Sequence, residues 1–467
     1  MPIRIFNNYI HRQVFYLAVV ETLMMIGAVY LGARLRFGGR LDAIFDSIGA
    51  VWPRALLIAL VVLASMVAMG LYHGRLRTRM SGIAVRVVAS CVAAGAALAL
   101  LFYIFPGLYL GRGALAITML LILIGLLLTR VMFHNLVDGS VFRRRVLVYG
   151  AGEKAANIVG LRRRSDQRGF KVIGFLPAEN NERHSVDQDK LLKPSGTIAE
   201  LAHEHRIDEI VVAIDDRRRG FLVQELLECK LNGIGVIDAM SFFERETGKV
   251  KLDLLYPSWM IFSEGFSRNP LRVLTSRVFD VLAALFLLFL TWPVMLIVVL
   301  AIWWEDGLDA PIIYRQQRVG LRNSVFDVMK FRSMIADAEK DGVAKWAEKN
   351  DSRITRVGSV IRKYRIDELP QIFNVLRGDM RFVGPRPERP SFVEELSHAI
   401  PYYKERHTVK PGITGWAQLC YDYGASSEDA LEKLQYDLYY VKNHNMLFDL
   451  LILLQTAEVV LWKSGAR

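Results

Sequence analysis

Four apolar blocks in the first third of the chain constrain its fold more than any other feature of the sequence. Each has about the length that a helix needs to cross the hydrocarbon core of a bilayer, and they cover residues 14–33, 48–71, 87–105 and 114–133. Because 23% of the 467 residues are nevertheless charged, the sequence predicts a helical four-span membrane region, residues 1–140, joined to water-exposed domains. Glu21 lies inside the first block, where an acid is expected to have a partner within the helix bundle.

Arginines in the short connecting loops indicate the orientation of these spans. They precede the first block, follow the second and follow the fourth, whereas those on the other side are fewer and are partly offset by acids. Cytoplasmic loops carry the excess of positive charge in membrane proteins. We therefore expect both the N-terminus and everything after the fourth span to lie in the cytoplasm.

The net charge of +12 restricts the classes of partner. A basic chain with membrane blocks suits anionic lipid headgroups and anionic phosphate substrates. No nucleic acid is expected as a partner, because the arginines lie beside membrane segments and do not form one basic stripe. The three cysteines, Cys91, Cys229 and Cys420, lie far apart, which predicts neither a zinc site nor a disulfide framework.

Residues 141–266 have the pattern of a Rossmann-like α/β domain. Apolar runs alternate there with helix-like segments, as is typical of a doubly wound parallel sheet. These runs cover residues 146–149, 171–176, 209–214 and 235–238. Gly150 and Gly152 follow the first run and partly match the dinucleotide fingerprint, whose glycines let a pyrophosphate approach a helix N-terminus. No clear acid ends the second run to hold a ribose, so a bound nucleotide and a nucleotide-free module for assembly or regulation both stay open.

The fifth apolar segment, residues 278–304, is long enough to span a membrane but is predicted not to do so. A crossing would remove the C-terminal domain, residues 267–467, from the cytoplasm, and arginines flank the segment on both sides. Pro293 removes a helix hydrogen bond mid-segment. The two arms would rise about 22 Å and 18 Å at helical pitch, less than a hydrocarbon core of about 30 Å. We expect a helix–break–helix, a re-entrant hairpin that enters and leaves by the cytoplasmic face.

A dense series of charged motifs follows this segment. Asp367 and Glu368 are adjacent and precede Pro370, so we expect both carboxylates at a helix terminus. Carboxylate oxygens are magnesium ligands, and a carboxylate can also attack phosphorus to give an acyl phosphate.

The cations of these motifs suit the cleavage of a diphosphate, which needs positive groups and usually Mg²⁺. Six of them could bind substrate phosphate or nucleotide: Lys330, Arg332, Arg362, Arg365, Arg386 and Arg406. The sequence therefore predicts a phosphoryl-transfer site, with Asp367 and Glu368 as catalytic and metal-binding residues and Mg²⁺ as cofactor.

The same residues also have a purely structural interpretation. An Asp-Glu pair is often solvated or caps a helix, and an arginine between two prolines, as Arg386 is, can simply belong to a stiff turn. That stiffness also suits a bidentate phosphate ligand. His407 is expected to be a hydrogen-bonded structural histidine. The density of arginines, the Pro-Arg-Pro turn and the upstream apolar segment together favour the catalytic interpretation.

Three motifs resemble those of the bacterial sugar transferase family, the monotopic phosphoglycosyl transferases. They are Asp367-Glu-Leu-Pro-Gln371, Gly384-Pro-Arg-Pro387 and Pro411-Gly-Ile-Thr-Gly415. With four spans and an α/β middle, the whole chain resembles the large form of the family, the exopolysaccharide polyprenyl glycosylphosphotransferases. The opening Arg-Ile-Phe-Asn-Asn-Tyr-Ile and the closing Gln435–Tyr440 run are similar to the branch associated with PEP-CTERM/exosortase systems.

This resemblance implies a mainly α-helical catalytic domain and a ping-pong reaction at a bacterial inner membrane. Asp367 would attack the phosphate next to the sugar of a UDP-sugar, with UDP-glucose as the expected donor. Undecaprenyl phosphate would then accept hexose-1-phosphate, the initiating step of exopolysaccharide biosynthesis, with Glu368 as metal ligand or base. Arg362 and Arg386 match family positions linked to phosphate or nucleotide binding, whereas Lys410 stands where an arginine is frequent. A homodimer is a further expectation.

Other functions stay open on the sequence. A membrane-anchored Rossmann oxidoreductase or epimerase would centre on Gly150 and Gly152, although no Tyr-x-x-x-Lys pair follows them. A non-enzymatic scaffold for polysaccharide assembly would use the spans and the α/β domain only to recruit partners. A processive glycosyltransferase is discounted, because its Asp-x-Asp is mimicked only by Asp187-Gln-Asp189 in a polar loop.

Overall fold

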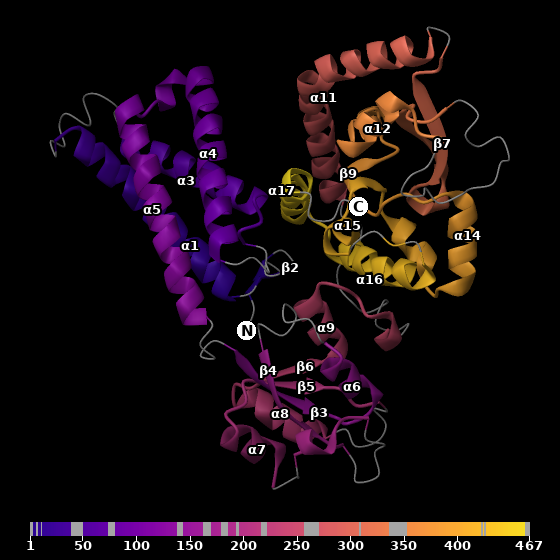
Figure 1. Cartoon of the computed structure of the whole chain (residues 1–467). Coiled ribbons are helices and arrows are strands. Elements are labelled where there is room, and N and C mark those ends of the chain that lie inside the picture. Colours follow the sequence, from indigo (N-terminus) through magenta and orange to yellow (C-terminus); the bar gives the residue numbers. More distant parts are fainter. Residues whose placement is uncertain are drawn as a thin grey trace. The chain divides into compact units, whose positions relative to one another are not determined.

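The chain divides into two units, Met1–Tyr256 and Pro257–Arg467, in the computed structural model (Figure 1). The structure describes residues 3–5, 8–10, 12–38, 50–72, 80–137, 143–161, 170–178, 185–192, 196–215, 222–255, 270–307, 310–335, 353–421, 424 and 426–462. The expected boundary between the middle and C-terminal domains, at 266/267, lies outside these residues and stays a prediction.

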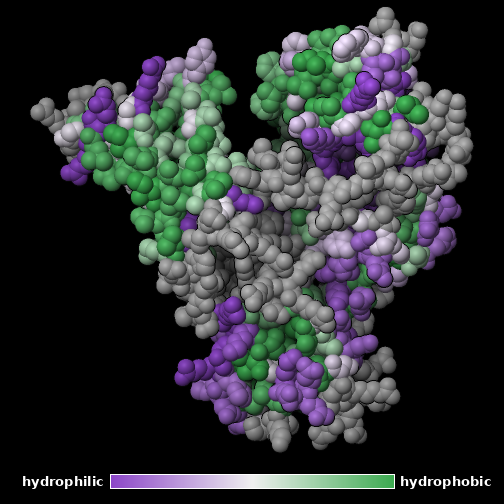
Figure 2. Space-filling model, in the orientation of Figure 1, coloured by the Kyte–Doolittle hydropathy of each residue, from purple (hydrophilic) through white to green (hydrophobic). Residues whose placement is uncertain are grey.

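Four long helices form from the apolar blocks of the first unit. They are α1 (Arg12–Arg36), α3 (Val51–Ala68), α4 (Met80–Ile104) and α5 (Arg112–Val137). α1 packs against α3 and α5, and α4 packs against the same two helices. Apolar side chains fill the interior of this bundle and also cover its outside (Figure 2), as lipid rather than water requires. The predicted helical membrane region is confirmed, and the protein is a membrane protein.

A buried ion pair ties α1 to α5 inside this bundle. Nε of Arg130 lies 2.8 Å from Oε1 of Glu21, and its Nη2 donates a hydrogen bond of 3.0 Å to Oε2. Tyr72 donates to the same carboxylate, and Arg130 also donates to the carbonyl of Leu71 at 2.7 Å. Charges at membrane depth persist when they are paired. The predicted partner of Glu21 within the bundle is thereby confirmed.

A four-stranded parallel sheet forms the centre of the α/β domain. Its strands, in the spatial order β4-β3-β5-β6, are β3 (Arg144–Tyr149), β4 (Phe170–Leu176), β5 (Glu209–Val212) and β6 (Gly235–Asp238). The helices of the domain are α6 (Glu153–Val159), α7 (Ile198–Glu204), α8 (Val223–Leu231) and α9 (Ala239–Thr247). Buried residues occupy all of β5, as in parallel sheets generally. The predicted α/β domain with a parallel sheet is confirmed.

Helix α11 (Pro270–Asp306) opens the second unit as one helix of 37 residues. Five described helices, α11 among them, are long and apolar enough to cross a bilayer. Pro293 lies inside α11, and Figure 1 shows that the helix bends sharply along its length. The expected helix–break–helix is thus a continuous, bent helix. Proline removes one helix hydrogen bond, and its ring clashes with the carbonyl group one turn earlier, which bends a helix without necessarily ending it.

The remainder of the second unit is mainly helical, as predicted. Its helices are α12 (Arg356–Lys363), α13 (Gln371–Arg377), α14 (Pro390–Ala399), α15 (Trp416–Cys420), α16 (Ser427–Asn443) and α17 (Met446–Trp462). An antiparallel hairpin, β7 (Ile313–Val319) with β8 (Val325–Phe331), was not predicted from the sequence. Strands β9 (Arg381–Val383) and β10 (Gly412–Thr414) form a short parallel pair.

Candidate active site

Asp367 and Glu368 lie on a single 3-10 turn, η6 (Ile366–Glu368), between two helices. α12 ends at Lys363, and Arg365 then takes a left-handed backbone conformation with a φ of 55°. Pro370 directly precedes α13, a position where the missing N–H of proline is tolerated. Both carboxylates thus lie between two helix termini, but Pro370 precedes the start of α13 and does not end the helix before the acids, as the sequence had suggested.

Apolar contacts on either side of the acid pair fix this turn. Ile366 and Leu369 pack against a buried cluster that includes Val298 and Ile302 of α11 and Phe331 of β8. The two carboxylates therefore lie on a short segment that packs against α11 and the β7–β8 hairpin.

Three cations surround Glu368. Its Oε1 lies 3.2 Å from Nη2 of Arg386 and 3.3 Å from Nζ of Lys330, and its Oε2 lies 3.7 Å from Nη1 of Arg365. Burial alone would raise the pKa of Glu368, but the charges of Arg386, Lys330 and Arg365 lower it to about 2. Glu368 is therefore an ionised, firmly held carboxylate.

Asp367 has the opposite environment, although it is the adjacent residue. Its side chain is buried, with 9% of the residue exposed. Within the described residues, its carboxylate accepts no hydrogen bond and forms no ion pair. Burial and the charge of Glu368 raise its pKa, while Lys330, Arg362 and Arg365 act in the other direction. Asp367 is thus a buried carboxylate with no fixed partner in the part of the chain that is described.

The backbone positions of Lys330 and Arg386 explain how they meet at Glu368. Lys330 lies near the end of β8, and burial lowers its pKa while the charge of Glu368 raises it. Arg386 lies in the turn after β9. A Cβ on Gly384 of that turn would lie 2.4 Å from the carbonyl oxygen of Lys410, so only glycine allows this close approach of two backbones.

Arg362 is a second group without an internal partner near the acids. Its Nη1 is buried and has no hydrogen-bond partner among the described residues. Its charge is near enough to lower the pKa of Asp367. Buried donors are normally satisfied, so this guanidinium is the described cation best prepared to bind a substrate phosphate.

Two other arginines predicted to bind phosphate, Arg332 and Arg406, instead have partners within the chain. Arg332 is buried and pairs with Asp306 at the end of α11. Arg406 is buried in η7 (Tyr403–Thr408), 2.7 Å from Oδ2 of Asp437, and donates to the carbonyl oxygen of Arg386 at 3.0 Å. Both guanidinium groups serve internal contacts: Arg332 anchors α11, and Arg406 supports the backbone of Arg386.

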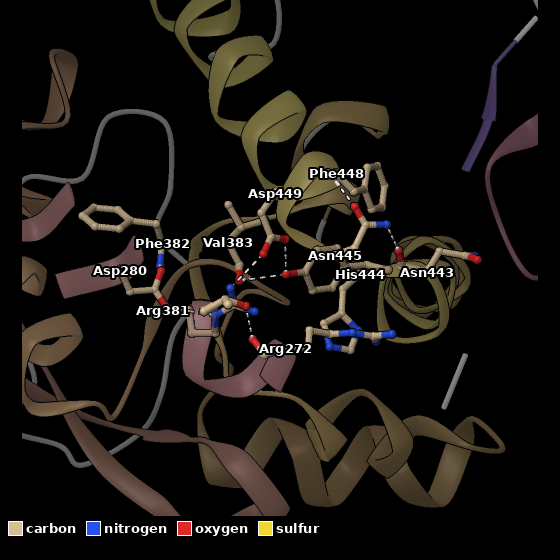
Figure 3. Close-up of polar contacts among 12 residues, drawn as sticks. Arg272, Asp280, Arg381, Phe382, Val383, Asn443, His444, Asn445, Phe448 and Asp449 are labelled. Atoms are coloured by element: carbon tan, nitrogen blue, oxygen red, sulfur yellow. Dashed lines mark hydrogen bonds and ion pairs between the residues drawn. The ribbon is translucent and has the colours of Figure 1, made fainter. Parts of the chain in front are cut away.

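A buried network of charges fixes β9, the strand that leads to Arg386 (Figure 3). Nε of Arg381 lies 2.9 Å from Oδ2 of Asp280 in α11, and its Nη2 lies 2.7 Å from Oδ2 of Asp449 in α17. The hydroxyl oxygen of Tyr440 lies 2.7 Å from Oδ1 of Asp449. This network was not predicted from the sequence. The signal that could have found it is the pair of isolated acids, Asp280 and Asp449, within apolar helices.

Two further residues of the motif series have structural contacts. Nδ1 of His407 lies 2.8 Å from Oδ1 of Asn323, and burial, with the charge of Arg406, lowers the histidine pKa to about 3. Lys410 donates to the carbonyl oxygen of Gly378 at 2.6 Å, just after α13. A single contact of this kind does not need the fork of an arginine, so the departure at Lys410 leaves the acid pair unaffected.

A magnesium ion would find few protein ligands at this site. The described residues contain no group of three or more His, Cys, Asp or Glu side chains that could hold a metal. Mg²⁺ is, however, usually bound by one or two carboxylates together with substrate phosphates and water. Asp367, whose oxygens have no partner within the described part of the chain, and Glu368, beside it, fit an ion of that kind.

Gly150 and Gly152 belong to the other unit and lie in the α/β domain. Gly150 follows β3, and Gly152 is the N-cap residue of α6. Their nearest neighbours across the sheet edge are residues that follow β5, namely Ala213 and Asp215.

Comparison with known proteins places this site in a family. The family described as bacterial sugar transferase matches residues 271–463. The UDP-glucose:undecaprenyl-phosphate glucose-1-phosphate transferase of Klebsiella pneumoniae is 31% identical over 324 residues, which cover 67% of each chain. The chain belongs to the bacterial sugar transferase family.

Two more relatives align with this chain over a smaller share of their own length. The UDP-N-acetylgalactosamine-undecaprenyl-phosphate N-acetylgalactosaminephosphotransferase of Aeromonas hydrophila is 41% identical over 263 residues, 56% of this chain and 61% of the relative. The undecaprenyl-phosphate glucose phosphotransferase of Komagataeibacter xylinus is 29% identical over 330 residues, 69% of this chain and 60% of the relative. The sugar transferase thus spans about three fifths of the length of these two proteins.

A second family, described as a CoA-binding domain, matches residues 67–229. This match includes the turn with Gly150 and Gly152. The assignment to the PEP-CTERM/exosortase branch stays a prediction.

Proposed function

We propose that this sugar transferase moves hexose-1-phosphate from a UDP-sugar to undecaprenyl phosphate. The observation that carries the proposal is the contrast between adjacent carboxylates: Asp367 has no described partner, whereas Glu368 lies among three cations. A nucleophile must be free to attack, and a diphosphate requires concentrated positive charge. The names of the relatives supply the donor and acceptor classes.

In the first half-reaction, a carboxylate oxygen of Asp367 attacks the phosphorus next to the sugar. The P–O bond to the second phosphate breaks, UMP leaves with the bonding electron pair, and an acyl phosphate joins Asp367 to the sugar. Lys330, Arg362 and Arg386 offset the negative charge on the transferring phosphate and on the leaving group.

In the second half-reaction, an oxygen of ionised undecaprenyl phosphate attacks the same phosphorus. The P–O bond to Asp367 breaks, the carboxylate is restored, and undecaprenyl-diphospho-hexose is formed. The raised pKa of Asp367 makes its carboxylate a better nucleophile than an exposed aspartate, provided that it is ionised.

Glu368 acts by charge rather than as a proton acceptor in this proposal. A carboxylate with a pKa of about 2 is a weak base near neutral pH, and undecaprenyl phosphate is already ionised there. Glu368 holds Lys330 and Arg386 in position until the diphosphate arrives and takes over part of their charge. Of its two expected roles, this favours the metal ligand.

Mg²⁺ is part of the proposal as the cofactor. Glu368 and Asp367 would hold it together with oxygens of the donor diphosphate, and when bound it would neutralise charge on that diphosphate. The roles proposed for Asp367, Glu368 and the surrounding cations are the same with and without bound Mg²⁺.

We propose further that α11 enters and leaves a bacterial inner membrane by the cytoplasmic face, while the four N-terminal helices cross it. Support comes from contacts at both ends of α11 with the same catalytic domain. Asp280 on the first arm pairs with Arg381, and Asp306 at the far end pairs with Arg332. A helix that crossed the bilayer would carry these two ends to opposite faces. Pro293 lies between them.

The test is transfer by the purified full chain in detergent. Radiolabelled UDP-glucose and UDP-N-acetylgalactosamine, the donors suggested by the sequence analysis and by the relatives' names, are each supplied with undecaprenyl phosphate. One donor should give a lipid-linked product and an equal amount of UMP. No product from either donor, with Mg²⁺ present and the protein folded, would contradict the proposal.

The alternative functions predict different results in the same samples. A Rossmann oxidoreductase or epimerase would interconvert the sugar or a nicotinamide without needing the lipid. An assembly scaffold would release no UMP and would be insensitive to Asp367→Asn. A homodimer stays a prediction that this assay leaves open.

A further inference from the structure

The glycine turn of the α/β domain carries a second expectation, because both its fingerprint and the CoA-binding family imply a diphosphate ligand. In Rossmann-like domains such a ligand accepts hydrogen bonds from the backbone amides at the start of the helix after the first strand. Here that helix is α6 (Glu153–Val159), which follows Gly150 and Gly152.

A carboxylate of the chain itself already occupies these amides. Oδ2 of Asp215 accepts a hydrogen bond of 2.8 Å from the backbone N–H of Glu153, and Oδ1 accepts one of 3.0 Å from that of Lys154. These are the first two residues of α6. The two carboxylate oxygens therefore stand where phosphate oxygens of a bound cofactor would have to lie.

The glycines are explained by the same contact. A Cβ on Gly152 would lie 2.0 Å from Oδ2 of Asp215. Gly150 has a φ of 119°, and a Cβ there would lie 2.6 Å from the carbonyl oxygen of Ala213. Gly150 needs glycine because the backbone that follows β5 passes so close, and a Cβ on Gly152 would displace the carboxylate of Asp215. No ligand is required to account for either position.

The nearby cation is engaged with the same segment. Nζ of Lys154 donates to the carbonyl oxygens of Ile214 and Asp215, each at 2.9 Å. A phosphate at this turn would face the negative charge of Asp215 and would have to displace it from two amides. At the ribose position, β4 ends at Leu176 and is followed by Pro177 and Ala178, neither of which can accept from a ribose hydroxyl through its side chain. The nearest acid, Glu179, follows in a polar loop and lies outside the described residues.

We propose that Asp215 is the permanent anion of this turn and that the α/β domain does not bind CoA or a dinucleotide through Gly150 and Gly152. The contacts of Asp215 hold the segment that follows β5 against the start of α6. The resemblance to a cofactor site then reflects the shared backbone geometry of Rossmann-like folds.

Hydrogen exchange read by mass spectrometry on the full chain in detergent tests this proposal. In the unsubstituted protein, millimolar CoA or NAD⁺ should leave exchange in peptides covering residues 150–159 unchanged. Asp215→Ala should speed exchange in the same peptides about fivefold, the effect of losing one helix cap. Formate, a small carboxylate, should restore protection in Asp215→Ala. Asp187→Ala, at a side chain that is 70% exposed, is the matched control and should change nothing there.

Two results would overturn the proposal. One is protection of residues 150–159 by CoA or NAD⁺ in the unsubstituted protein, a measurement that needs no variant. The other is unchanged exchange in Asp215→Ala. If that variant does not fold, Asp215→Asn replaces it, because the amide keeps the shape and one acceptor while removing the charge. Faster exchange in Asp215→Asn would then support the proposal, and unchanged exchange would contradict it.

Discussion

The glycine turn of the α/β domain and the acid turn of the catalytic unit treat a carboxylate in opposite ways. Asp215 accepts two backbone hydrogen bonds and closes its turn. Asp367, by contrast, is buried with no partner among the described residues, and its pKa is raised. Burial raises the free energy of an ionised carboxylate, so a buried carboxylate without a partner among the described residues is a candidate for function. A carboxylate with fixed partners, such as Asp215, is therefore structural, whereas Asp367 is free to react. Substitutions at the two kinds of position should have different effects.

The largest expected effect is on catalysis at Asp367. Asp367→Asn should lower transfer at least about a thousandfold, because an amide cannot form the acyl phosphate. Its melting temperature should not fall, since the substitution removes a buried charge that has no described partner. Initial rates and thermal melts on the same preparation measure both quantities. Asp327→Asn, at an exposed acid on β8, is the control. Near-normal transfer by Asp367→Asn would contradict the role of Asp367 as the nucleophile.

The reverse pattern is expected at Asp280, an engaged carboxylate. Asp280→Ala removes one of the two acids that pair with Arg381 and should lower stability by about 3 kcal/mol. The transfer rate per folded molecule should fall far less than in Asp367→Asn. Thermal melts, compared with those of Thr275→Ala on an exposed part of the same helix, give the stability. A melting temperature equal to that of the control would show that this network does not hold α11.

A smaller effect is expected from Arg386→Lys. Lysine keeps the charge but cannot bind a phosphate in the bidentate manner of arginine. We expect kcat/KM to fall about tenfold, while Arg315→Lys at an exposed position on β7 has no effect. Steady-state kinetics with the accepted UDP-sugar provide the measurement. Equal values for the two variants would remove Arg386 from the substrate site.

The smallest effect concerns pH. Since Asp367 must be ionised to attack and its pKa is raised, kcat/KM should begin to fall, as the pH is lowered, above the ordinary aspartate value of about 3.9. The charge of Glu368 contributes to that rise, so the residual activity of Glu368→Gln should lose its acid limb at a lower pH. An acid limb that moves upward, or does not move, would contradict the assignment.

The pKa of Glu368 also predicts how stability depends on pH. Its pKa is lowered to about 2 in the folded protein, from an ordinary value near 4.5. The stabilisation is therefore complete above about pH 4.5 and is lost as the pH falls toward 2. Glu368→Gln should flatten the loss of melting temperature in this range. An equally steep loss in that variant would mean that other carboxylates dominate.

Local features of the site could be predicted from the sequence. Asp367, Glu368 and Pro370 are neighbours in the sequence, so their closeness was already visible there, although contacts of Ile366 and Leu369 with α11 and β8 fix the turn. The strands of the α/β domain are short apolar runs, and such runs predict buried strands. These are the parts of the fold that short-range physics determines.

The roles of individual arginines could not be predicted in the same way. Arg406 faces Asp437 and Arg332 faces Asp306, and only the packed fold brings these residues together. Charge and motif context are the same for an arginine that binds substrate and for one that is paired internally. The bend of α11 could be predicted from Pro293, but the break could not: the helix stays continuous from Pro270 to Asp306 (Figure 1).

A covalent bond between Asp367 and the sugar phosphate can be tested by trapping that species. The purified chain is incubated with radiolabelled UDP-sugar but without undecaprenyl phosphate, then digested and analysed by mass spectrometry. The account predicts one hexose phosphate on the peptide containing Asp367, release of one UMP per labelled chain, and loss of the label when undecaprenyl phosphate is added. Label on another residue, or lipid-linked product formed by Asp367→Asn at the normal rate, would contradict it.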